Sequence, residues 1–150
     1  MRIFKKQLIG TFLLSLLWFG CDPGYELHPV GWQSISEHKW SKHFGDFELQ
    51  TRGIGGFIGE WWVDPDLQVY NNVKPISVES AELRTAETTF AAKIHSDIIP
   101  PSKSGYNIPV SWEFDQKRAA PEVLGDHCEI ILNLKVDSEK RQIKIEYERE

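Results

Sequence analysis

Cysteine and basic residues are scarce in this chain of 150 residues. The two cysteines, Cys21 and Cys128, allow one disulfide at most. Three of the 17 Lys and Arg residues precede Gln7, so 14 basic residues face 22 acidic ones after residue 20, a net charge near −8. Affinity for nucleic acid comes from clustered Lys and Arg that neutralise phosphates, so we expect no nucleic-acid partner. The acidic balance also argues against a polybasic contact with anionic lipid.

Charged residues are absent from Gln7 to Cys21, a stretch filled with Leu, Ile, Phe and Trp. This run is too short for a transmembrane helix, which needs about 20 consecutive apolar residues. It follows Met1–Lys6, a segment with three positive charges. A basic start followed by an apolar run is typical of an export signal. We therefore predict that residues 1–20 are a signal peptide and that the remaining 130 residues form one domain.

The apolar run ends in Leu17-Trp-Phe-Gly-Cys21, which resembles the lipobox of bacterial lipoproteins. The resemblance implies that Cys21 is acylated and becomes the new N-terminus, so that acyl chains attach the protein to a membrane of the bacterial cell envelope. Cys128 is then a free thiol. The alternative is an ordinary secretory signal, which needs small residues near the cut, but no alanine precedes Ala81. Under that alternative, Cys21 and Cys128 are free to pair in an oxidising compartment.

Residues 21–45 are predicted to hold the acylated cysteine, a tether and one short helix. Residues 22–33 contain two prolines and two glycines without periodicity, which indicates a tether. Ser34 and Glu37 have the spacing of a capping box, and Gly45 is a stop signal. We therefore expect a helix from Ile35 to Phe44, docked on the domain through Trp40 and Phe44.

From Asp46 onward, apolar residues recur at every second position, which indicates strands. The last hairpin is the clearest example, with alternation over residues 128–136 and 143–147 around a polar turn. A bulge is expected near Ser80. Seven or eight short strands at such intervals predict an all-β fold, an antiparallel sandwich over residues 46–150. The other expected strands contain Phe47 and Leu49; Trp61 to Val63; Leu67 and Val69; Ile76, Val78, Ala81 and Leu83; Phe90, Ala92 and Ile94; and Val110, Trp112 and Phe114.

Part of this pattern resembles the immunoglobulin-like domains of bacterial surface lipoproteins. The resemblance rests on Asp66–Asn72, Pro75–Leu83, Pro101 and Val110–Phe114, and it covers roughly residues 46–149. It implies an immunoglobulin-like β-sandwich. It brings no catalytic residues, and the paired cysteines of antibody domains are missing.

The most suggestive binding residues are Trp61 and Trp62, which follow a run of four glycines between residues 53 and 59. The run does not match a dinucleotide-binding loop, and we interpret it as a bulged or flexible strand connection. Neighbouring residues of a strand point to opposite faces, so one tryptophan is expected on the surface unless the short helix covers it. Exposed tryptophan anchors protein partners and also stacks on sugar rings. We predict a partner-binding patch of Trp61, Trp62, Phe57 and Ile58.

Other reactive residues do not form a convincing site. The five histidines are scattered without metal-ligand spacing, and Cys128 is expected to face the core. Ser36–Lys39, Tyr70–Asn72 and Lys103–Gly105 follow the order of three motifs of penicillin-recognising enzymes. Each match is only three or four residues long, and a helix and turns already explain all three. We therefore predict no catalytic residue, no metal and no cofactor.

The sequence thus favours a non-enzymatic, lipid-anchored envelope protein that binds another protein. Such a protein is an accessory or assembly subunit, or an inhibitor or immunity factor against a toxin. The alternative is a lipoprotein that binds or processes cell-wall glycan. The side of the membrane on which it lies, periplasmic or cell surface, is left open.

Overall fold

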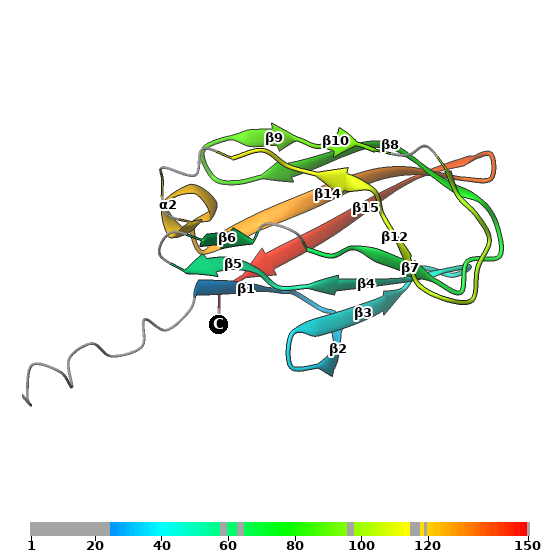
Figure 1. Ribbon diagram of the computed structural model, residues 1–150, viewed down its shortest axis with the longest axis horizontal. Helices are drawn as coiled ribbons and strands as arrows, with labels where there is room; N and C mark the ends of the chain where they lie inside the picture. The colour runs from blue at the N-terminus through cyan, green and yellow to red at the C-terminus, as the bar shows by residue number, and fades with distance from the viewer. Residues whose placement is uncertain are drawn as a thin grey trace, which may run out of the picture.

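The computed structural model describes residues 25–57, 60–62, 65–95, 98–114, 118 and 120–149. This part of the chain contains fifteen strands and one short helix, and every strand pairing in it is antiparallel. Figure 1 shows the arrangement as an elongated body of sheets. The prediction of an all-β fold is confirmed.

The larger sheet is built around the hairpin of β14 (His127–Val136) and β15 (Glu139–Glu148), each ten residues long. Their pairing is continuous, and Asp137 takes the positive φ of 57° that a two-residue hairpin turn favours. The predicted last hairpin is therefore confirmed. Along the sheet, the strands follow the order β11 (Ile98–Ile99), β8 (Ile76–Arg84), β14, β15, β1 (Tyr25–Pro29), β5 (Ile54–Phe57) and β6 (Glu60–Trp62), and β9 (Thr89–Ala91) also pairs with β8.

A second sheet of five strands faces the first. Its order is β12 (Tyr106–Asn107), β7 (Gln68–Tyr70), β4 (Glu48–Arg52), β3 (Lys39–His43) and β2 (Gln33–Ser36). Two further short strands, β10 (Lys93–Ile94) and β13 (Val110–Ser111), pair with each other. These short segments bring the total above the seven or eight strands expected.

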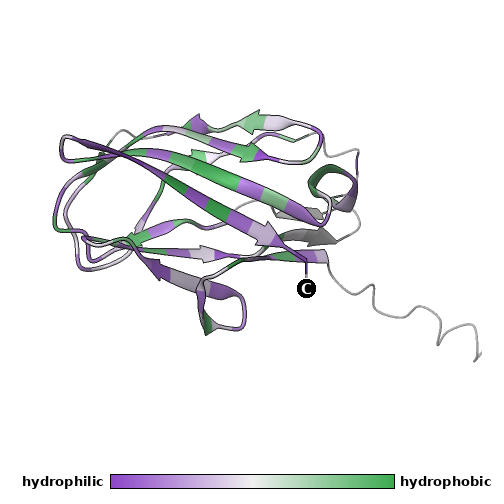
Figure 2. Ribbon diagram, turned by 180° about the vertical axis from the view of Figure 1, so that it is seen from behind, coloured by the Kyte–Doolittle hydropathy of each residue, from purple (hydrophilic) through white to green (hydrophobic). Residues whose placement is uncertain are grey.

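Both sheets contribute to one hydrophobic core. Leu49 and Val69 of the five-stranded sheet belong to the same buried cluster as Leu132 and Ile145 of the larger sheet, and all four are fully buried. Figure 2 shows the cause, because hydrophobic and hydrophilic residues alternate along the long strands. Alternation buries one face of each sheet and leaves the other to solvent.

The predicted bulge near Ser80 is present. The register of β8 against β14 shifts between the pairs Asn133 with Ser80 and Leu134 with Val78, so Glu79 is the extra residue. A bulge adds one residue to one strand and increases the local twist. The Asn133 amide also donates to the Ser80 hydroxyl at 2.8 Å, which closes the irregular site.

The predicted helix from Ile35 to Phe44 is wrong, because this segment forms the hairpin β2–β3. All five residues of β3 pair with β4, so the sheet supplies the backbone hydrogen bonds that a short helix would have had to make alone. Trp40 is buried and stacks near His28 with ring centroids 4.9 Å apart. Ser34 does not cap a helix, since its hydroxyl donates to the Ser36 carbonyl at 3.2 Å.

The predicted tether over residues 22–33 is also wrong from Tyr25 onward. Residues 25–29 form β1, which pairs with β15 on one side and β5 on the other. Its alternate residues Tyr25, Leu27 and Pro29 are buried, but five residues with a terminal proline give a weak strand pattern. Cys21 and residues 22–24 lie outside the described residues.

The one helix of the described residues was not predicted. It is α2 (Ala120–Leu124), with Pro121 in its first turn and Leu124 fully buried in the core. Gly125 ends it with φ of 67°, and its amide donates to the Pro121 carbonyl at 3.0 Å. A single turn of helix has too few residues for periodicity to reveal it.

Candidate functional site

The β5–β6 hairpin, formed by Ile54–Phe57 and Glu60–Trp62, belongs to the larger sheet, whereas β4 before it and β7 after it in the chain belong to the five-stranded sheet. The chain leaves the five-stranded sheet at Arg52, pairs β5 with β1 in the larger sheet, and returns to the five-stranded sheet at β7. In the described part of the chain, β6 pairs only with β5 and ends the order of the larger sheet. The hairpin therefore forms one edge of that sheet (Figure 1).

Glycines in this segment are required by the close approach of β1. A Cβ atom on Gly55 would collide with the Tyr25 backbone carbonyl. A Cβ atom on Gly53 would instead collide with the side chain of Glu26. Gly55 and Gly56 are therefore part of a paired strand, which explains their presence without a bound nucleotide.

A buried hydrogen-bond network fastens the base of the hairpin. The Arg52 amide donates to the Pro65 carbonyl at 2.7 Å, and the Thr51 hydroxyl donates to the same carbonyl at 3.0 Å. The Thr51 oxygen also lies 2.7 Å from the Tyr147 hydroxyl on β15. Because the single Thr51 proton is directed at Pro65, Tyr147 is the donor of this contact. Burial raises the pKa of Tyr147, which keeps its proton in place.

The predicted partner-binding residues fall on this hairpin. Phe57 ends β5 opposite Glu60, while Trp61 stands opposite Gly56 and Trp62 opposite Gly55. Ile58 lies outside the described residues. The structure thus brings Phe57, Trp61 and Trp62 together in one two-stranded unit, with glycines at the register positions facing both tryptophans. Which tryptophan is exposed stays a prediction.

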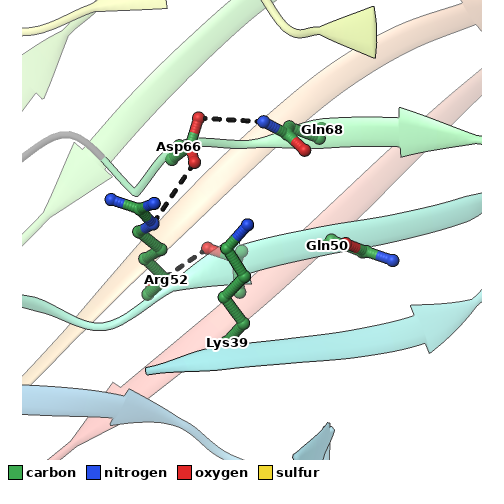
Figure 3. Close-up of a pocket in the computed structure, with 6 residues that line it drawn as sticks. Lys39, Gln50, Arg52, Asp66 and Gln68 are labelled. Carbon is green, nitrogen blue, oxygen red and sulfur yellow. Dashed lines mark hydrogen bonds and ion pairs between the residues drawn. The ribbon is translucent and has the colours of Figure 1, made fainter. Parts of the chain in front are cut away.

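A polar cluster lies beside the base of the hairpin, on the outer face of the five-stranded sheet (Figure 3). Arg52 pairs with Asp66 at 3.3 Å, Gln68 donates to Asp66 at 3.2 Å, and Tyr70 donates to Gln68 at 2.8 Å. Lys39 lies on β3, Arg52 on β4, and Gln68 and Tyr70 on β7, while Asp66 lies just before β7. The sequence pattern did not predict this cluster. The sequence signal that could have found them is that they occupy polar positions alternating with the apolar residues Leu49 and Val69.

The hollow in this polar cluster is shallow. It is lined by Lys39, Gln50, Thr51, Arg52, Asp66 and Gln68, and its space of about 140 Å³ includes open solvent. Sites that enclose a small-molecule ligand usually offer roughly 300–1,000 Å³. The cluster therefore suits contact with the surface of a larger molecule better than enclosure of a small one.

Cys128 faces the core, as predicted. Its side chain is 1% exposed, and burial, assisted by the charge of Glu129, raises the pKa of the thiol to about 12. Such a thiol is a poor nucleophile and a poor metal ligand. Across the described ranges, no group of three or more His, Cys, Asp and Glu side chains is placed to bind a metal ion.

The three segments that resemble penicillin-recognising motifs do not meet. Tyr70–Asn72 lies near Lys103–Gly105, since the Ser102 amide donates to the Asn72 carbonyl at 3.0 Å. Ser36, however, belongs to β2, which is separated from β7 by β3 and β4. Three strand spacings amount to about 14 Å, too far for the serine to share a reaction centre with the other two.

No protein-family model, curated protein or solved structure matches this chain. The structure defines its class as an all-β protein with two antiparallel sheets over one core. Among the residues with a described position, no helix has the length and hydropathy to cross a membrane.

Proposed function

We propose that this chain is a lipid-anchored, non-enzymatic protein-binding module of the bacterial cell envelope, with an immunoglobulin-like sandwich. It acts as an accessory or assembly subunit, or as an inhibitor or immunity factor. The observation that carries the proposal is the β5–β6 hairpin, which has a sheet edge and two tryptophans in the same element. The sandwich is supported by two antiparallel sheets that share a core.

A sheet edge and tryptophans are two features that protein partners use. An edge strand offers backbone N–H and C=O groups to which an extended segment of another protein adds as a further strand. Tryptophan is enriched among the residues that contribute most to protein interfaces. The network of Thr51, Pro65 and Tyr147 fixes the hairpin base, which reduces the entropy lost when a partner binds.

The membrane attachment is supported by the lipobox-like residues and by the position of β1. Cys21 precedes Tyr25 by four residues, and Tyr25 is the first residue of a strand inside the larger sheet. An acylated Cys21 would therefore attach the domain directly, with little intervening chain. The protein would remain at the envelope surface where its partner is expected.

The proposal is tested by affinity capture of the protein from crosslinked, detergent-solubilised membranes. Trp61→Ala and Trp62→Ala are compared separately with wild type, and Val73→Ala, at a residue that is 71% exposed outside the hairpin, is the matched control. We expect a specific partner to be lost from at least one tryptophan variant that keeps a native circular-dichroism spectrum. Equal recovery of all partners by both variants and the control would refute the binding role of the hairpin.

A second candidate function is binding of cell-wall glycan by the polar cluster. Gln50, Gln68, Asp66 and Arg52 offer the amide, carboxylate and guanidinium groups that hydrogen-bond sugar hydroxyls, and Tyr70 lies in the same network. Titration with soluble muropeptides tests it, with Gln68→Ala as the variant and Glu79→Gln, outside the cluster, as the control. Binding that Gln68→Ala alone weakens would favour this candidate, and absence of wild-type binding would dismiss it.

A further inference from the structure

We propose that one end of the sandwich, here called the anchor end, rests on the lipid headgroup layer of the membrane that holds Cys21. The anchor end consists of Tyr25 at the start of β1, the paired residues Phe57 and Glu60 of β5 and β6, α2 with Gly125 and Asp126, and the last residues of β15. This inference rests on the proposed acylation of Cys21, and it adds a second membrane contact made by the folded domain.

Hydrogen bonds and strand register bring these segments together. Tyr25 is paired with Gly56, so the start of β1 lies beside the last residues of β5. The Tyr25 hydroxyl donates to the Gly125 carbonyl after α2, and the Arg149 guanidinium lies 5.5 Å from the centre of the Tyr25 ring. Figure 1 shows α2, the start of β1 and the end of β5 at one end of the long axis, with the β14–β15 turn at the other.

The length of the connecting chain decides which end meets the bilayer. Cys21 lies four positions before Tyr25, so the two residues are at most about 14 Å apart whatever the conformation of the three residues between them. Strand β14 alone, with ten residues, extends about 33 Å along the body. An acyl chain on Cys21 therefore keeps the anchor end near the headgroups, whereas the β14–β15 turn would reach them only if the body lay flat on the membrane.

The chemistry of the anchor end favours the membrane interface over electrostatic attraction to anionic lipid. Tryptophan and other aromatic residues concentrate at the level of the headgroups, and the hairpin contains Phe57, Trp61 and Trp62. The charges nearby are slightly acidic in sum, with pairs between Arg149 and Asp126 at 3.6 Å and between His127 and Glu148 at 3.6 Å. The contact should therefore not strengthen when anionic lipid is added.

The first test is quenching of tryptophan fluorescence by brominated lipid. The acylated protein is purified from membranes and reconstituted into phosphatidylcholine vesicles that carry bromine near the headgroup. Five tryptophans follow Cys21, and the two in β6 are adjacent strand residues that project to opposite faces. We therefore expect one of them to meet the headgroups, which would quench up to about one fifth of the emission and leave the other available to a protein partner. The quenching should disappear in Trp61→Phe/Trp62→Phe and persist in the control Trp32→Phe.

A second measurement leaves the hairpin unchanged. Glu122→Cys on α2 and Ser138→Cys in the β14–β15 turn are labelled with an environment-sensitive fluorophore, which is selective because Cys128 is buried. We expect the label at residue 122 to be quenched by brominated lipid several-fold more than the label at residue 138. Replacing part of the phosphatidylcholine by phosphatidylglycerol should not increase either signal.

The outcomes separate the anchor from the docking. The intact mass of the same preparation shows whether Cys21 is acylated. A protein without acyl chains on Cys21 would overturn both the anchor and the docking. The docking alone is overturned if acylated protein floats with the vesicles but the labels at residues 122 and 138 are quenched equally and the β6 tryptophans are not quenched. Quenching at the anchor end with none at residue 138 supports it.

Discussion

Replacing Tyr147 by Phe should loosen the contact between the two sheets at the base of the β5–β6 hairpin. The Tyr147 ring is fully buried, and its hydroxyl donates to Thr51 at 2.7 Å. A buried hydrogen bond contributes about 1 kcal/mol net, and an acceptor left without its donor adds to the loss, so we expect destabilisation by about 1–3 kcal/mol. For a domain of this size that corresponds to a fall in Tm of roughly 3–10 °C.

A double-mutant cycle with Thr51→Val isolates the hydrogen bond. Thr51→Val leaves the buried Tyr147 hydroxyl without its hydrogen-bond acceptor, whereas the double variant removes both polar groups. The double variant should therefore be more stable than the sum of the single effects implies, with a coupling energy of about 1 kcal/mol. Urea denaturation followed by tryptophan fluorescence measures all four proteins. A change below about 0.5 kcal/mol in Tyr147→Phe, together with strict additivity, would refute the reasoning.

The pH dependence provides a further check on the same side chain. Burial raises the pKa of Tyr147 in the folded state above the unfolded value of about 10. The stability contributed by the neutral phenol is therefore complete below pH 10 and is lost as the pH rises above it. Wild type should lose more stability than Tyr147→Phe between pH 9 and pH 11. Equal losses would contradict the assignment.

Three other perturbations test the core, the strand pairing and an ion pair. Cys128 should react with an alkylating reagent at pH 8 about a thousand-fold more slowly in the folded protein than in urea. The reason is its pKa of about 12, which leaves about one thiol in 10⁴ ionised at this pH. Fast labelling of the folded protein would contradict the burial of Cys128. Gly55→Ala should destabilise the protein by about 1–3 kcal/mol, because the added Cβ meets the backbone of β1. Gly53→Ala should lower the stability less, because its Cβ meets only a movable side chain. Equal losses of stability would argue against the close approach of β1 to Gly55. The hydrogen bond from Arg141 lowers the pKa of Asp46, so the stability that the ionised Asp46 contributes is present above pH 4 and is lost on acidification. In denaturation at several pH values, the difference in unfolding free energy between wild type and Asp46→Asn should therefore narrow from pH 7 to pH 3. A difference that stays constant would exclude the ion pair as its cause.

Long strands were predictable because their signal is local. Burial alternates over residues 143–147 and, apart from the buried Ile131, over residues 128–136, a pattern that no turn or helix produces, and the hairpin was predicted at its true place. The bulge near Ser80 was predictable for the same reason, since the apolar alternation of β8 changes phase there. In both cases the residues that decide the structure are neighbours in sequence.

The predictions from sequence failed where residues far apart in the chain determine the structure. Ser34 and Glu37 match a capping box, but β3 gains a complete partner in β4, and this ladder outweighs a local cap. The β5–β6 hairpin joins the larger sheet by pairing with β1, a strand too short to recognise by alternation. The polar cluster around Asp66 and Gln68 required knowledge of which strands are neighbours, so it could not be assembled from sequence.

The position of β1 determines how the domain bears a mechanical load applied through the residues before Tyr25. Strand β1 lies between β15 and β5 in the larger sheet, with hydrogen-bonded neighbours on both sides. A pull along its axis therefore loads these hydrogen bonds together in shear, whereas an edge strand pulled sideways would open one bond at a time. Tension from a membrane attachment would therefore enter the sheet at an interior strand, and the pairing of Tyr25, Glu26 and Leu27 with β5 would be the first to carry it.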